Sequence, residues 1–106
     1  MTSDDFSAIA LALPDVEEKV GRYEIDLTRN GRHIARLRDK ATTLAIRVPW
    51  ELHDQLLAMK GTKFFKTDHY TRYPYVLIRV EDLDEDRAGS LVAASFEIAP
   101  DPLPLR

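Results

Sequence analysis

The chain has 106 residues, 44% of them hydrophobic and 31% charged, so it has the length and composition of one globular domain rather than of a disordered tail. It contains no cysteine, which excludes disulfide bonds, zinc–thiolate centres and cysteine nucleophiles. The formal net charge of −3 hides an uneven distribution, because residues 19–79 hold 13 Lys and Arg against 6 Asp and Glu, whereas the two flanks hold 2 against 12.

The N-terminal segment predicts a short helix. Thr2 or Ser3 is a suitable N-cap, the two aspartates that follow suit the first turn, and Pro14 ends the helix. The apolar residues that recur at helical spacing are Phe6, Ile9, Ala10 and Leu13.

A β-hairpin is predicted next. Apolar and polar residues alternate over residues 22–27, and Asn30-Gly31 marks the turn into the following strand. We expect a three-residue loop with Gly31 as a left-handed bulge residue, because this register pairs Ile25 with Ala35 and keeps apolar side chains together. A two-residue loop would instead place Arg36 beside Ile25.

The rest of the chain predicts alternating strands and helices. The expected elements are a strand at Thr43–Val48, a helix that begins at Pro49, a short strand at Phe64–Phe65, a strand at Tyr75–Val80 and a helix from Asp84 to Ala99. The predicted class is therefore α+β: two layers, in the order α-β-β-β-α-β-β-α, with a five-stranded antiparallel sheet and helices mainly on one face. We expect residues 1–106 to form a single domain that carries a proline-rich tail at 100–106.

The basic middle of the chain supplies the candidate functional residues. Cationic side chains on the open face of the sheet, together with a loop rich in Lys, Arg and Tyr over residues 63–75, suit a phosphate backbone or unstacked bases. If helices cover one face of the sheet, the open face is expected to present Arg22, Arg36, Arg38, Arg47, Tyr75, Leu77 and Arg79. The predicted nucleic-acid-binding residues are Arg36, Arg38, Arg47, Lys63, Lys66, Arg72, Tyr73 and Arg79. Two alternatives stay open: a solvated face whose arginines pair with Glu24 and Asp26, and a loop whose tyrosines only close the edge of the core.

No pattern in the sequence predicts catalysis. His33, His53 and His69 fall on a strand, a helix and a loop, so we predict no catalytic, cofactor-binding or metal-binding residues and a non-enzymatic protein. The N-terminus lacks the features of a signal peptide and no apolar run approaches the ~20 residues of a membrane span, so we expect a cytoplasmic protein without membrane contact. Trp50, the single tryptophan, is expected either to pack in the core or to mark a protein contact.

Several phrases of the sequence resemble the MmcQ/YjbR-like family. They are LALPDVEE at Leu11–Glu18, RHIARL at Arg32–Leu37, FFKTDHYTRYPYVLIRVEDLD at Phe64–Asp84, and the pair Ala99-Pro100 that ends the last helix. The resemblance implies a two-layer domain with a five-stranded antiparallel sheet, of the type shared with secretion-chaperone-like proteins. Members of the family are commonly labelled DNA-binding. The partner implied is thus nucleic acid, and the alternative is a protein-interaction or chaperone-like module, as a homodimer or with another protein.

Overall fold

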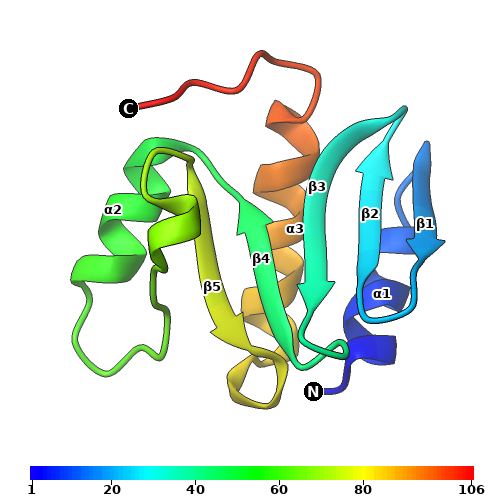
Figure 1. Cartoon of the computed structure of the whole chain (residues 1–106), viewed down its shortest axis with the longest axis horizontal. Helices are drawn as coiled ribbons and strands as arrows, with labels where there is room; N and C mark the ends of the chain where they lie inside the picture. Colours follow the sequence, from blue (N-terminus) through cyan, green and yellow to red (C-terminus); the bar gives the residue numbers. More distant parts are fainter.

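The computed structural model describes residues 1–106 as an antiparallel sheet with helices packed mainly on one face (Figure 1). In chain order the elements are α1 (Ser3–Leu11), β1 (Val16–Val20), β2 (Ile25–Arg29), β3 (Arg32–Arg38), β4 (Thr43–Arg47), α2 (Trp50–Ala58), the 3₁₀ turn η1 (Asp68–Tyr70), β5 (Tyr75–Arg79), the 3₁₀ turn η2 (Val80–Asp82) and α3 (Glu85–Ile98). Each strand pairs with the next one in the order β1-β2-β3-β4-β5. The predicted α+β class with a five-stranded antiparallel sheet is confirmed.

The predicted order of elements is wrong in one place. The structure runs α-β-β-β-β-α-β-α, because Val16–Val20 forms an edge strand, whereas Phe65 makes only an isolated bridge to Leu77. The sequence of β1 is VEEKV, and three adjacent charged residues give no alternation to detect. An edge strand tolerates such a sequence, because it needs only one hydrogen-bonded neighbour and its charges discourage pairing with other chains.

The register of the β2–β3 hairpin also differs from the prediction. Asn30 and Gly31 both have positive φ, 49° and 79°, as a two-residue turn of the primed type requires. The register shifts between Leu27 and Thr28, so that Leu27 lies opposite Ala35 while Thr28 lies opposite His33. The apolar residues are thus brought together by a bulge inside the strand rather than by a longer loop, and the bulge leaves His33 on the face opposite the helices.

The main core lies between the sheet and the helices α1 and α3. Thr2 caps α1 through a reciprocal capping box with Asp5, and Asp84 caps α3 by accepting a hydrogen bond from the backbone N–H of Arg87. Ser95, the polar member of the buried stripe of α3, donates to the carbonyl of Ile34 at 3.1 Å. The buried residues of this core are Phe6, Ala10, Leu27, Ile34, Ala35, Leu37, Leu44, Ile46, Val48, Leu56, Val76, Ile78, Val80, Leu83, Ala88, Leu91, Val92 and Ala99.

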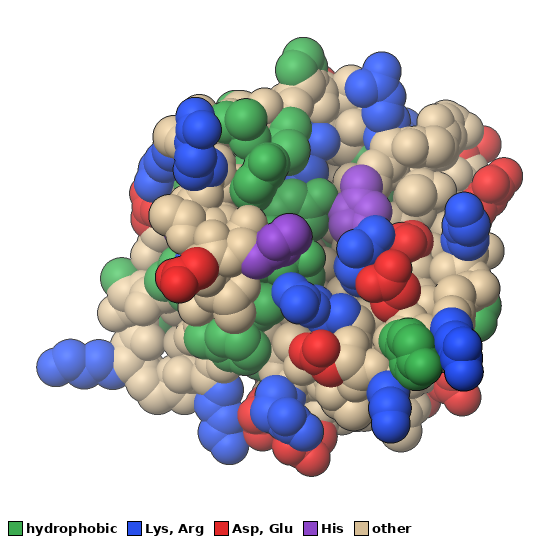
Figure 2. Space-filling model, in the orientation of Figure 1, with side chains coloured by type: hydrophobic (Ala, Val, Ile, Leu, Met, Phe, Trp, Pro, Cys, Tyr) green, Lys and Arg blue, Asp and Glu red, His purple; other side chains and the backbone are tan.

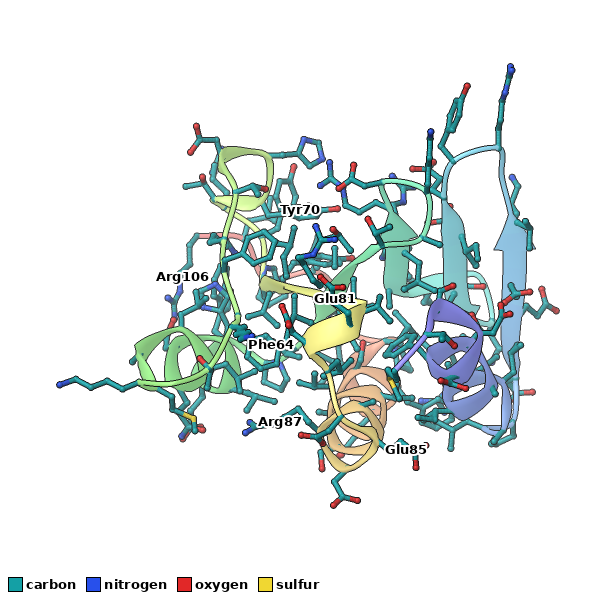
Figure 3. The ribbon with its side chains drawn as sticks, turned by 90° about the horizontal axis from the view of Figure 1, so that it is seen from below. Phe64, Tyr70, Glu81, Glu85, Arg87 and Arg106 are labelled. Atoms are coloured by element: carbon teal, nitrogen blue, oxygen red, sulfur yellow. The ribbon has the colours of Figure 1, made fainter.

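The other face of the sheet is less open than the sequence indicates. The segment between α2 and β5 folds over it, and Tyr70 packs with Ala45, Tyr75 and Leu77 in a second small cluster. Viewed from below, Tyr70 lies on the side of the sheet opposite α3 (Figure 3). The expectation that Arg47, Tyr75 and Leu77 are exposed on this face is therefore wrong, since all three are buried.

The alternation of β5 between the two faces predicts the effect of a charge on stability. Ile78 is buried in the main core, so Ile78→Asp leaves an unpaired charge there and should destabilise the domain by at least about 3 kcal/mol. Arg79→Gln, one position along the strand on the exposed side, should stay within about 0.5 kcal/mol of the parent. Urea unfolding monitored by circular dichroism checks both. Equal stability of the two variants would contradict the assignment of faces.

Candidate ligand groove

A groove of about 420 Å³ lies on the face of the sheet opposite α1 and α3. We call it the open-face groove. In Figure 2 histidine side chains border a patch of hydrophobic side chains on this face. The residues that line the groove are His33, Arg36, His69, Tyr70, Tyr73, Tyr75 and Leu103.

A chain of hydrogen bonds across three strands forms the floor of the groove. The Tyr75 hydroxyl and His33 Nδ1 are 2.7 Å apart, and His33 Nε2 lies 3.3 Å from Asp26 Oδ1. Arg36 donates to the same carboxylate, from Nε at 2.7 Å and from an Nη at 3.3 Å, and its guanidinium lies 3.6 Å from Glu24. This network joins β2, β3 and β5 and fixes the orientation of the His33 ring.

The surroundings of the network determine its protonation. Burial raises the pKa of Tyr75 to about 12, so its hydroxyl keeps its proton and donates to His33. Burial lowers the pKa of His33, although Asp26 opposes this effect. Burial alone would raise the pKa of Asp26, but the hydrogen bonds from Arg36 and His33 outweigh it and the pKa falls. Both nitrogens of a neutral His33 are thus engaged, and the network orients groups rather than presenting a free base.

Two of the eight predicted binding residues line the open-face groove. They are Arg36 and Tyr73, and 38% of the surface of Tyr73 is exposed. Arg38 lies at the side, with its guanidinium 5.6 Å from the centre of the Tyr70 ring and 3.8 Å from Asp39.

Two further predicted residues serve the interior of the structure. Arg47 is only 5% exposed, and its guanidinium donates to the carbonyls of Ala99, Asp101 and Pro102. Lys66 donates to the carbonyls of Tyr73 and Tyr75, and burial lowers its pKa. Neither the Arg47 guanidinium nor the Lys66 ammonium is free to bind a phosphate of another molecule.

The remaining three predicted residues lie apart from one another. Lys63 contacts Asp82 at 3.2 Å, Arg79 contacts Glu81 at 2.9 Å, and Arg72 Nε donates to the carbonyl of Arg106 at 2.9 Å. The predicted set does not form one basic surface, and Lys and Arg are interspersed with Asp and Glu on the face in Figure 2. The alternative of a face whose arginines pair with Glu24 and Asp26 describes Arg36, whereas Arg79 pairs with Glu81 instead.

Of the other five lining residues, His69, Tyr70 and Tyr75 belong to the segment 63–75 that the sequence indicated, whereas His33 and Leu103 were not predicted at all. His33 lies on this face only because of the bulge at Ile34, and no feature of the sequence separates that bulge from a longer turn. Leu103 belongs to the C-terminal segment, which bends back over the end of the sheet (Figure 1). Trp50 was expected in the core or at a contact, and it lies half-buried beside that segment, outside the main core.

The structure defines an α+β domain with an aromatic and cationic groove. No cluster of three or more His, Cys, Asp or Glu side chains is arranged to hold a metal ion, and none of the helices has the length and apolar character to cross a membrane. A scan against models of protein families found no match. Searches of curated proteins and of solved structures found no similar protein either. The resemblance to the MmcQ/YjbR-like family therefore stays a prediction from the sequence.

The lowered histidine pKa values predict how stability depends on pH. His33 and His53 both have pKa values held below 6.5, mainly by burial, so the unfolded chain takes up protons that the folded chain refuses. The stabilisation is present above pH 6.5 and is lost as the pH falls, so the free energy of unfolding should decrease between about pH 7 and pH 5.

An NMR titration of the histidine ring protons measures this directly. The midpoint of His33 should lie below 6.5, and His33→Gln should reduce the pH dependence of urea unfolding while leaving the contribution of His53. A midpoint of His33 above 6.5 would contradict the buried, hydrogen-bonded ring.

Proposed function

We propose that this chain is a small non-enzymatic domain that binds single-stranded nucleic acid weakly in the open-face groove. One observation carries the proposal: the groove brings the rings of Tyr70, Tyr73 and His69 next to the guanidinium of Arg36 on the face that the helices leave free. Bases stack on aromatic rings whatever their sequence, and a guanidinium binds a phosphate oxygen. The volume falls in the range of small-ligand sites, about 300–1,000 Å³.

The pairing of the cations favours a single strand over a duplex. Duplex binding rests on many free phosphate contacts, whereas most of the cations in the predicted set already contact carboxylates or carbonyls of the protein. Arg36 shares its charge with Asp26 and Glu24, so it neutralises a phosphate only in part. Base stacking should therefore contribute more to the binding free energy than phosphate neutralisation does, and we expect weak binding with a shallow dependence on salt.

The nucleic-acid partner and the cytoplasmic location proposed for this chain were both expected from the sequence. Proteins of the MmcQ/YjbR-like family, which the chain resembles, are commonly labelled DNA-binding, and nucleic acid is the partner proposed here. A cytoplasmic location, where RNA and DNA are accessible, also belongs to the proposal.

Fluorescence anisotropy with a labelled mixed-sequence single strand tests the groove. Binding should be saturable, and log K should fall against log salt with a slope of about −0.7 to −1.4, equivalent to one or two phosphates. Tyr73→Ala should weaken binding at least about fivefold, since a stacked base contributes roughly 1–3 kcal/mol.

Two control variants separate the groove from other surfaces. Tyr23→Ala removes a tyrosine that is 56% exposed outside the groove, and Lys63→Ala removes an exposed cation paired with Asp82. Both should bind as the parent does. The groove is excluded as the binding site if Tyr73→Ala and Tyr23→Ala bind equally, and the absence of any binding at low salt excludes the function.

The alternative function, a protein-interaction module that forms homodimers, has one supporting observation. The outer edge of β1 has no neighbouring strand, and Val20 at its end is 68% exposed. Unpaired backbone groups of an edge strand are able to pair with a second chain, although Glu17, Glu18 and Lys19 oppose it. Sedimentation equilibrium distinguishes the cases: a monomer over the accessible concentration range excludes the homodimer.

A further inference from the structure

The last seven residues, PDPLPLR at 100–106, cross the end of the sheet next to α2 instead of leaving the domain (Figure 1). Every second residue from Pro100 to Pro104 is a proline, which fixes φ and removes the backbone donor. A segment of this kind favours the extended polyproline conformation, in which the carbonyls have no internal partners and are free to accept hydrogen bonds. The segment is exposed, and none of its residues belongs to the main core.

Donors from two different elements reach those carbonyls. Arg47 at the end of β4 donates from Nη2 to the carbonyls of Asp101 and Pro102, at 3.0 and 3.1 Å. The Nε1–H of Trp50, the first residue of α2, donates to the carbonyl of Pro104. Docking of extended proline-rich segments against aromatic side chains is a recurring mode of peptide recognition.

The arginine that follows the prolines is held by a second set of contacts. Its guanidinium donates to both carboxylate oxygens of Asp54, at 3.0 and 2.9 Å, and lies 4.0 Å from the centre of the Trp50 ring. Its backbone N–H donates to the carbonyl of Arg72 at 3.0 Å, and Arg72 Nε donates back to the Arg106 carbonyl. In Figure 3 Arg106 lies next to α2. Arginine geometry suits this combination of a two-point carboxylate contact with stacking on an aromatic ring.

We propose that Arg47, Trp50, Asp54 and Arg72 form a binding site for an extended peptide of the pattern Pro-x-Pro-x-Arg, supplied by a partner protein, and that residues 101–106 occupy this site within the same chain. Arg47, Trp50 and Arg72 donate to backbone carbonyls, and Trp50 and Asp54 contact the arginine side chain. The site therefore recognises an extended conformation and one cation rather than a particular apolar sequence. None of the four lines the open-face groove, so the proposal does not depend on nucleic-acid binding.

The segment lies on the surface, so a peptide of a partner protein is able to replace it without unfolding the domain. About half of the side-chain surface of both Arg106 and Asp54 is exposed, 53% and 52%, so the ion pair forms and breaks without unfolding. An intramolecular segment competes at a high effective concentration, which means that a partner peptide binds well only when the arginine contact is weakened.

Trp50 is the single tryptophan and reports on its own site. The experiment titrates the free heptapeptide PDPLPLR into the full-length Arg106→Ala protein and into the parent, with tryptophan fluorescence as the readout. We expect saturable binding to Arg106→Ala and about tenfold weaker apparent binding to the parent, where the attached segment competes. A control heptapeptide with alanine in place of its arginine should bind Arg106→Ala about tenfold more weakly than PDPLPLR, from the combined loss of the ion pair and the stacking contact.

A second variant tests whether the change in fluorescence comes from peptide binding at this site. Asp54→Asn removes the ion pair from the receptor side and leaves the contact with the Trp50 ring, so it should bind PDPLPLR more weakly than Arg106→Ala does. The proposal is overturned by either of two results with Arg106→Ala: no saturable change with PDPLPLR, or equal affinity for the arginine and alanine peptides.

Discussion

The buried guanidinium of Arg47 is the interaction on which the arrangement of the uncovered face depends. Arg47 is 5% exposed and forms no ion pair, so its charge must be stabilised by hydrogen bonds to oxygen atoms. Those oxygens are the carbonyls of Ala99, Asp101 and Pro102. The end of α3 and the segment after it are therefore tied to the end of β4. This tie places Leu103 at the wall of the open-face groove and the following residues beside Trp50 and Asp54.

Part of the basic middle of the chain contacts other groups of the protein rather than solvent. Arg29 donates to the carbonyl of Phe96 and lies over its ring, Lys66 holds the carbonyls of Tyr73 and Tyr75, and Arg36 pairs with Asp26. A local charge of this size suggests an anion-binding surface when it is read from the sequence, but binding depends on charges that remain free. Arg47 and Lys66 instead hold the carbonyls of segments that cross the sheet. The exposed cations without a hydrogen-bond or ion-pair partner are spread over the surface outside the open-face groove, which itself holds one shared guanidinium; they are Lys19, Arg22, Arg32, Lys40 and Lys60.

The parts of the fold that sequence reasoning predicted are those with strong periodicity. Residues 43–48 and 75–80 alternate, and the stripe of α3 recurs at helical spacing, so the element types and the faces that meet in the main core follow from the pattern. The burial of the other face of β4 and β5 does not follow from it, because that face is covered by the segment before β5. β1 has no such pattern, since its charged residues stand at an edge where one face and one side are open to solvent. The bulge at Ile34 was not predictable, because the choice between a bulge and a longer turn depends on packing against Leu27 and the helices.

The residues that line the open-face groove were predictable only where they depend on local sequence. Tyr73 and Arg36, which stand in the basic, aromatic middle, are predicted binding residues that line this groove. His33 reaches the groove through the bulge, and Leu103 reaches it through the contact of distant carbonyls with Arg47. Neither the bulge nor the contact with Arg47 can be predicted from the spacing of residues in the sequence. The folding of the segment between α2 and β5 over Ala45 and Leu77 likewise depends on tertiary packing of Tyr70.

Backbone ¹⁵N relaxation of residues 101–106 tests the central claim that Arg47 holds this segment against the domain. The amides of Leu103, Leu105 and Arg106 should have order parameters close to those of the rigid backbone, about 0.85. Values below about 0.6 would describe a free tail, and would contradict both the tie through Arg47 and the wall that it gives to the groove.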